Sequence, residues 1–148
     1  MADRSDRIKP VARLADNRES RAAKALAEAQ QRLEQQRQQL TNLHGYQAEY
    51  QQALEAAGRQ GLRGQQVRDF RRFLIQVDQA IAGQQQVVER AEAEVEQARR
   101  KWLAARTETR RVETLQSWYA DEEAQREQRQ EQKETDERAG RPRGGTGR

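Results

Sequence analysis

Apolar residues recur along this chain in alternating steps of three and four positions, which is the spacing of a heptad repeat on an α-helix. Over residues 67–119 the pattern runs without interruption, and all but three of its sixteen positions are apolar. The residues between these positions are mostly Gln, Glu and Arg. A helix with so narrow an apolar stripe is not stable alone in water, so the pattern predicts a partner helix.

A second heptad pattern with a thinner apolar stripe precedes the first. It covers residues 12–57 and places leucines at equivalent positions, namely Leu26, Leu33, Leu40 and Leu54. Proline is acceptable only in the first turn of a helix, so this helix is expected to begin between Asp6 and Pro10. The chain therefore predicts two long helices.

Glycines separate the two helical patterns. Gly58, Gly61 and Gly64 predict a flexible connection, and Gly58 suits the position just after a helix. We expect one hairpin over residues 1–139, with helices at about 8–57 and 67–139 and a loop at 58–66. Residues 140–148, rich in Gly and Arg, predict a disordered tail.

Two heptad helices joined by a short loop fold back as an antiparallel coiled coil. The favoured register sets small residues opposite large ones, such as Ala22 opposite Trp102. It also matches opposite charges along the edges, in the pairs Arg18–Glu108, Arg32–Glu94, Lys9–Glu113, Asp16–Arg106 and His44–Asp78. The predicted fold class is all-α: a long two-helix antiparallel coiled-coil hairpin with a single-helix C-terminal overhang of about 25 residues.

Composition supports this fold and limits the location. With 34% hydrophobic residues, 5% aromatics and a mean hydropathy of −1.28, the chain cannot fill a layered globular core. No segment has the apolar run of a secretory signal or of a membrane span. We therefore expect a cytoplasmic protein with no direct membrane insertion.

Catalytic, metal and cofactor chemistry find little support in the residues. His44 is the only histidine and there is no cysteine, so we expect no metal site and no cofactor. The acidic residues of 121–137 surround a solvated helix, where nothing buries them to shift their pKa. The glycine connection lacks the strand and the Gly-Lys-Ser/Thr of a phosphate-binding loop. We therefore predict that the chain is not an enzyme.

Nucleic-acid binding also has weak support. The net charge of +4 comes from 28 basic and 24 acidic residues, which is a modest excess. Arginines cluster at 59–72, including Arg63, and again at 99–111, but no aromatic stacking platform lies between them. We expect no nucleic-acid partner.

Some large apolar side chains are not used by the heptad seam. One group lies along one edge towards the loop and includes Tyr46, Phe73 and Ala80, and another gathers at the open end. Exposed aromatics of this kind are common anchors of protein interfaces, although both could simply shield the seam.

An ordered set of residues carries a family resemblance. It comprises Arg13-Leu14-Ala15 with Arg18-Glu19 and Ala22-Ala23, Leu43-x-x-Tyr46-x-x-Glu49-Tyr50, Phe70-x-x-Phe73-Leu74 with Ala80-Ile81, and Trp102 with Arg106 and Glu113. In this order and spacing, over residues 7–139, the set resembles the flagellar export protein family FliJ. Gln84 and the Arg/Gly tail are not diagnostic of that family.

The resemblance implies a non-enzymatic component of the flagellar type III protein export apparatus, similar to the central stalk of rotary ATPases. Its implied partners are the export ATPase hexamer, the export gate membrane protein and export chaperones. The implied location is cytoplasmic, peripheral at the inner-membrane face of the flagellar basal body. The alternatives are a basic helical hairpin that binds RNA or ribosomes and a purely structural coiled-coil spacer.

The resemblance implies one set of binding residues, and the open end of the hairpin suggests another. Those for the export gate, near the loop, are Gln39, Leu43, Tyr46, Tyr50, Phe73, Val77 and Ala80. For the ATPase ring we expect the open end, because only that end offers a slender helix with charges of both signs. The residues proposed there are Val11, Leu14, Leu115, Trp118, Arg126, Arg129 and Lys133.

Overall fold

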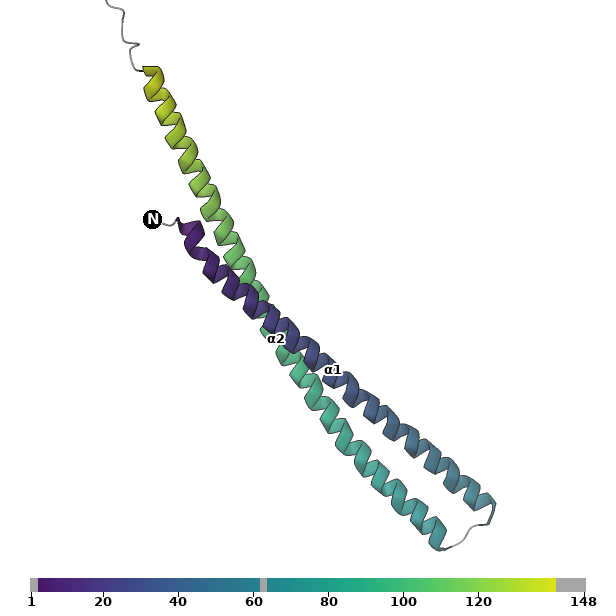
Figure 1. Cartoon of the computed structure of the whole chain (residues 1–148). Helices are drawn as coiled ribbons and strands as arrows, with labels where there is room; N and C mark the ends of the chain where they lie inside the picture. The colour runs from purple at the N-terminus through teal and green to yellow at the C-terminus, as the bar shows by residue number, and fades with distance from the viewer. Residues whose placement is uncertain (1–2, 62–63, 141–148) are drawn as a thin grey trace, which may run out of the picture. The chain divides into compact units, whose positions relative to one another are not determined.

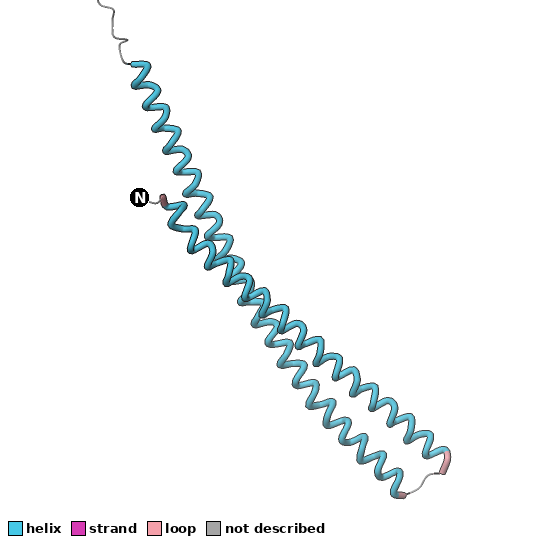
Figure 2. The backbone as a smooth tube through the Cα atoms, viewed as in Figure 1, coloured by secondary structure: helices cyan, strands magenta, loops and turns pink. Residues whose placement is uncertain are grey.

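The computed structural model describes residues 3–61 and 64–140, and within these ranges it contains two α-helices and no strand (Figure 1). Helix α1 spans Arg4–Arg59 and helix α2 spans Gln65–Gly140. The two helices pack against each other as a helical hairpin, which confirms the predicted fold class (Figure 2). Arg63 and residues 141–148 of the expected tail lie outside the described residues.

The apolar seam lies where the heptad spacing predicts it. All sixteen seam positions of α2 between residues 67 and 119 are buried or half-buried, and so are the apolar and glutamine positions predicted on α1 from 12 to 57. Four half-buried or buried positions were not in the predicted stripe of α1, namely Ser5, Ile8, Glu19 and Ala53. Glu19 lies between Ala15 and Ala22 at heptad spacing. The spacing therefore indicates a seam position, although a charged side chain is not typical of one.

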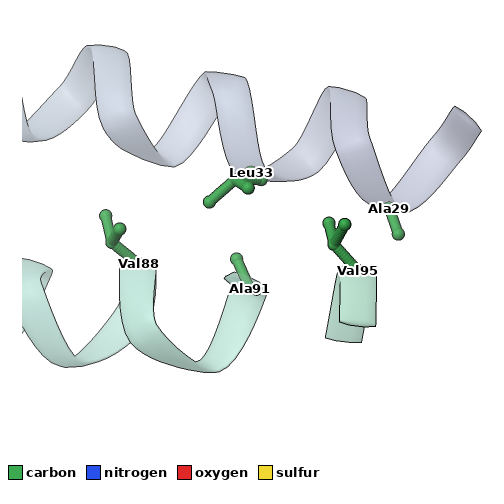
Figure 3. Close-up of a cluster of buried hydrophobic side chains, with 5 residues drawn as sticks. All are labelled: Ala29, Leu33, Val88, Ala91 and Val95. Atoms are coloured by element: carbon green, nitrogen blue, oxygen red, sulfur yellow. The ribbon is translucent and has the colours of Figure 1, made fainter. Parts of the chain in front are cut away.

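The hairpin divides into two compact units, each containing a segment of both helices. The unit of Arg21–Leu103 contains the loop, and its core is a cluster of Ala29, Leu33, Val88, Ala91 and Val95 (Figure 3). Ala29 is the most buried of these, with 2% of its surface exposed. The small alanines and the β-branched valines of this cluster let the two helices approach closely, and Leu33 fills the space that the smaller side chains leave.

A polar layer interrupts this core. The side-chain amide of Gln84 donates to the backbone carbonyl of Gln36 at 3.0 Å and to the side-chain oxygen of Gln36 at 2.8 Å. Half-buried amides must be paired because an unpaired one costs about 1–3 kcal/mol. The layer therefore favours the alignment of α1 and α2 in which these two glutamines meet.

The unit of Met1–Ser20 and Ala104–Arg148 contains the open end of the hairpin. Ile8, Ala15 and Val112 form its buried cluster, with Ala12 and Tyr119 packed against it. Thr109 is buried at a seam position, and its hydroxyl lies 3.3 Å from the Ala15 carbonyl and 3.0 Å from the Ala105 carbonyl. The hydroxyl is thus satisfied without water, although it stands in an apolar seam.

Helix α1 begins earlier than the proline predicts. It starts at Arg4, with the Asp6 and Arg7 amides both 3.0 Å from the Asp3 carbonyl, so Pro10 lies inside the helix. A proline there removes one backbone hydrogen bond and crowds the carbonyl four residues earlier. Burial of Ile8 and a contact from Ser5 to α2 give the first turn stabilising interactions that local propensity does not include.

The connection also differs in detail from the prediction. Gly58 is still helical, and α1 ends one residue later at Arg59. The left-handed conformation occurs instead at Gly61 and Gly64, whose φ angles are 77° and 67°. A residue with a Cβ is strained at such angles, so these two positions, rather than Gly58, need glycine.

Most predicted edge pairs do not form as expected. Arg32 lies 3.8 Å from Glu94, as predicted. Lys9, however, bonds to Asp6 within α1 at 2.9 Å, and Glu108 lies 3.9 Å from Arg111 within α2. Asp78 accepts a hydrogen bond from Gln47. Exposed pairs are each worth only about 0.2–1 kcal/mol, so a neighbour three or four residues away on the same helix competes easily with one across the edge.

The overhang is shorter than expected because α1 starts earlier. Ser5 contacts Glu123, and every residue of 124–140 is exposed. Helix α2 therefore continues alone for about 17 residues, or roughly 25 Å. Leu115 and Trp118, predicted to belong to the overhang, lie instead in the paired part of the unit.

Candidate protein-docking surfaces

The first candidate surface is a loop-end patch, which we define by Tyr46, Phe73 and Ala80. All three are exposed, with 54% of Tyr46 and 40% of Phe73 accessible. Heptad spacing places each of them at the edge of the seam, next to a seam residue, so their side chains flank the core without entering it. Large aromatics left outside a core are unusual unless a partner covers them.

The other residues expected at this surface take supporting positions. Leu43 and Tyr50 are half-buried in the seam, and Val77 is buried with 7% exposed. Gln39 is exposed on α1, farther from the loop than Leu43. The Tyr50 ring lies 4.2 Å from the Phe73 ring at an interplanar angle of 43°, so a seam residue fixes the exposed aromatic.

A shallow hollow of about 450 Å³ adjoins the loop-end patch. It is lined by Tyr50, Gln66, Asp69, Phe70 and Phe73. Gln66 and Asp69 were not among the residues expected to bind a partner. Gln66 lies four residues before Phe70, and Asp69 lies four residues before Phe73. Residues at this spacing share a helix face, so the spacing could have identified both.

The second candidate surface is an open-end groove on α2. Leu115 and Trp118 are exposed, at 41% and 55%, and line a groove of about 660 Å³ together with Arg110, Arg111, Thr107 and Thr114. The Trp118 ring lies 5.3 Å from the Tyr119 ring. The groove combines an aromatic anchor with two cationic side chains, which suits a partner surface that is apolar at its centre and acidic at its rim.

The remaining residues expected at the open end lie outside this groove. Val11 and Leu14 are about half exposed on α1. Arg126 pairs with Glu122 at 3.2 Å and lines a separate polar hollow with Arg4, Arg7 and Tyr119. Arg129 and Lys133 are exposed on the overhang. The open end therefore presents an apolar groove and a charged single helix next to it.

A contact between Ser5 and Glu123 marks where the overhang begins. The Ser5 backbone amide donates to Glu123 Oε1 at 3.1 Å, and the Ser5 hydroxyl donates to Oε2 of the same carboxylate. The amide of Ser5 is one of the N-terminal groups that a helix cannot pair internally, so Glu123 caps α1 from the other helix. These hydrogen bonds, the hydroxyl first, hold the pKa of Glu123 below its ordinary value.

Two kinds of site are not seen in the described part of the chain. No group of three or more His, Asp or Glu side chains in residues 3–61 and 64–140 could hold a metal ion. Over the same ranges, neither helix is apolar enough along its length to cross a bilayer.

Comparison with known proteins gives one result. The family model described as "Flagellar FliJ protein" matches residues 4–143, nearly the whole chain. No curated protein and no solved structure matches the chain significantly.

Proposed function

Because the chain belongs to the flagellar FliJ family, whose members are components of the flagellar protein export apparatus, we propose that it is the non-enzymatic stalk of that apparatus. In this proposal it associates with the export ATPase hexamer, promotes ring assembly and activity, and links the ring to the export gate membrane protein and to export chaperones. It acts in the cytoplasm, peripheral to the inner-membrane face of the flagellar basal body.

The open end is the part that enters the ATPase ring. The observation that carries this assignment is the overhang, which is fully exposed over residues 124–140 and has acidic and basic side chains on all sides. A stalk that meets several equivalent subunits needs a surface that does not lock onto one of them, and a polar single helix offers such a surface. The neighbouring groove of Leu115 and Trp118 would provide the anchor at its base.

Truncation after Glu123 tests this assignment. Deleting residues 124–148 keeps Glu123 on Ser5 and both buried clusters, so the cooperative melting of the hairpin should change little. Stimulation of the ATPase and assembly of its ring should fall severalfold because the overhang is missing. The measurements are circular dichroism melting and ATP hydrolysis with purified ATPase.

The matched control replaces Arg18, Arg21 and Lys24 with glutamine, which changes exposed charge elsewhere and should leave stimulation intact. Full stimulation by the truncated chain would show that the overhang is not the ring contact. Loss of the melting transition would show that the overhang supports the fold.

The loop-end patch is the surface for the export gate. Its Tyr46 and Phe73 are exposed, and the seam residue Tyr50 holds the Phe73 ring, which lowers the conformational entropy that Phe73 loses on binding. Tyr46→Ala with Phe73→Ala should weaken binding to the cytoplasmic part of the gate by about tenfold or more, as expected for lost aromatic anchors. Calorimetry and motility assays measure the effect.

An equally exposed apolar residue away from the patch provides the control for this pair. Leu103, with 48% exposed, can be changed to alanine in the same assays and should have no effect. Retained gate binding and motility in the Tyr46→Ala, Phe73→Ala variant, with its helicity unchanged, would rule out the patch as the gate contact.

A further inference from the structure

An apolar residue surrounded by arginines lies on the outer face of α2 near the loop. Ile75 is 58% exposed, the largest exposed fraction among the large apolar side chains that the structure describes. Arg72, Arg71 and Arg68 precede it by three, four and seven residues, so all four share one face of the helix. This cationic face is distinct from the loop-end patch, which flanks the seam.

The three arginines of the cationic face are not neutralised by the protein. All are exposed, and none takes part in an ion pair among the described residues, whereas Arg37 and Arg126 elsewhere do. Two carboxylates of α2 lie close in sequence, but each accepts from a glutamine amide: Asp69 from Gln65, and Asp78 from Gln47. The face therefore presents three guanidinium groups without a salt-bridge partner in the described part of the chain, around an exposed apolar centre.

We propose that the cationic face docks this end of the hairpin on an anionic phospholipid bilayer. Guanidinium groups pair with lipid phosphates, and the isoleucine side chain enters the boundary between headgroups and acyl chains. The face is the convex outside of one helix, and Ile75 is not among the residues that line the nearby hollow of Tyr50, Gln66, Asp69, Phe70 and Phe73. A convex face fits a planar, fluid surface better than it fits a protein partner, whose anchors need a pocket.

The inference goes beyond the export function and does not require it. Nucleic acid is the other polyanion with which arginines pair, but proteins that bind single strands also stack the bases on aromatic side chains, and the cationic face contains none. The association is peripheral, since neither described helix is apolar enough to span a bilayer. Each arginine near an anionic surface contributes about a fivefold gain in binding.

Vesicle binding by the full chain tests the proposal without any flagellar partner. The chain should cosediment with vesicles of phosphatidylcholine containing phosphatidylglycerol, but not with pure phosphatidylcholine. Replacing Arg68, Arg71 and Arg72 with glutamine should weaken binding by about 100-fold, following the per-residue gain. Replacing Arg18, Arg21 and Lys24 with glutamine removes equal charge elsewhere and should weaken it much less.

A fluorescent label shows which face meets the lipid. The chain has no cysteine, so Ile75→Cys gives a single site for an environment-sensitive dye. Its emission should shift to the blue with anionic vesicles, while the same dye at Gln52→Cys, exposed on α1, should not shift. Equal binding to both vesicle types, equal binding by the two triple variants, or binding to an oligonucleotide with none to vesicles would overturn the proposal.

Discussion

Single side chains decide where the paired part of this molecule ends. Ser5 and Glu123 are far apart in the sequence, and neither has the apolar side chain that is typical of a heptad core position. Their hydrogen bonds nevertheless join the two helices at the open end. Arg4 adds to this closure, with its guanidinium 5.9 Å from the centre of the Tyr119 ring. Each of these contacts is small, but all of them join the first turn of α1 to α2.

The Ser5–Glu123 contact has a titration that can be measured. Because Ser5 donates to the charged carboxylate, the pKa of Glu123 lies below its ordinary value of 4.5. Its contribution to stability is therefore present above the unfolded pKa and is lost as the pH falls through the lower, folded value. Carbon-13 NMR of the Glu123 carboxyl should show a depressed midpoint.

Changing Ser5 to alanine removes the hydroxyl donor, so the Glu123 midpoint should move up towards 4.5. If the Glu123 midpoint is the same in the unaltered chain and in the Ser5→Ala variant, the contact does not form in solution.

At the scale of helices, the spacing of apolar residues was sufficient to predict the pairing. Every predicted seam position of α2 is at least half-buried, including the polar Gln84 and Thr109. The structure explains why these two polar residues are tolerated, because each side chain forms a hydrogen bond with α1. A heptad repeat encodes this result locally, since each turn repeats the same requirement for burial.

Features that depend on weak or competing interactions could not be predicted in the same way. Of the edge pairs, Arg32–Glu94 forms while Lys9 and Glu108 find partners on their own helices, and the energies of the two choices are similar. The start of α1 depends on a tertiary contact, the hydrogen bond from Ser5 to Glu123 on α2. This contact outweighs the cost of placing Pro10 inside the helix. Arg110 and Arg111, by contrast, precede Trp118 by eight and seven residues, so helical spacing could have placed them on the face of the open-end groove.

For the molecule as a whole, the important question is whether both helices of a pair belong to one chain. In the cluster around Leu33, Ala29 and Val95 are buried and face each other from α1 and α2 (Figure 3). Because the chain has no natural cysteine, Ala29→Cys with Val95→Cys should form a disulfide within one chain under oxidation. The product should migrate as a monomer on non-reducing gels and melt at higher temperature.

Moving one cysteine to the outside of its helix provides the comparison. Gln30→Cys with Val95→Cys places one thiol on an exposed position and should cross-link poorly. Disulfide-linked dimers from the Ala29→Cys, Val95→Cys chain would show that α1 of one molecule pairs with α2 of another.

The cap at the start of α1 also affects a length, because its position sets how far α2 extends beyond the paired helices. Each residue added to α2 beyond Glu123 lengthens the free helix by about 1.5 Å, and each residue added to α1 before Ser5 would cover the same length of it. The contact thus sets the point at which the free part of α2 begins. Moving the contact along α2 would change the length of the free helix without altering any residue of the seam.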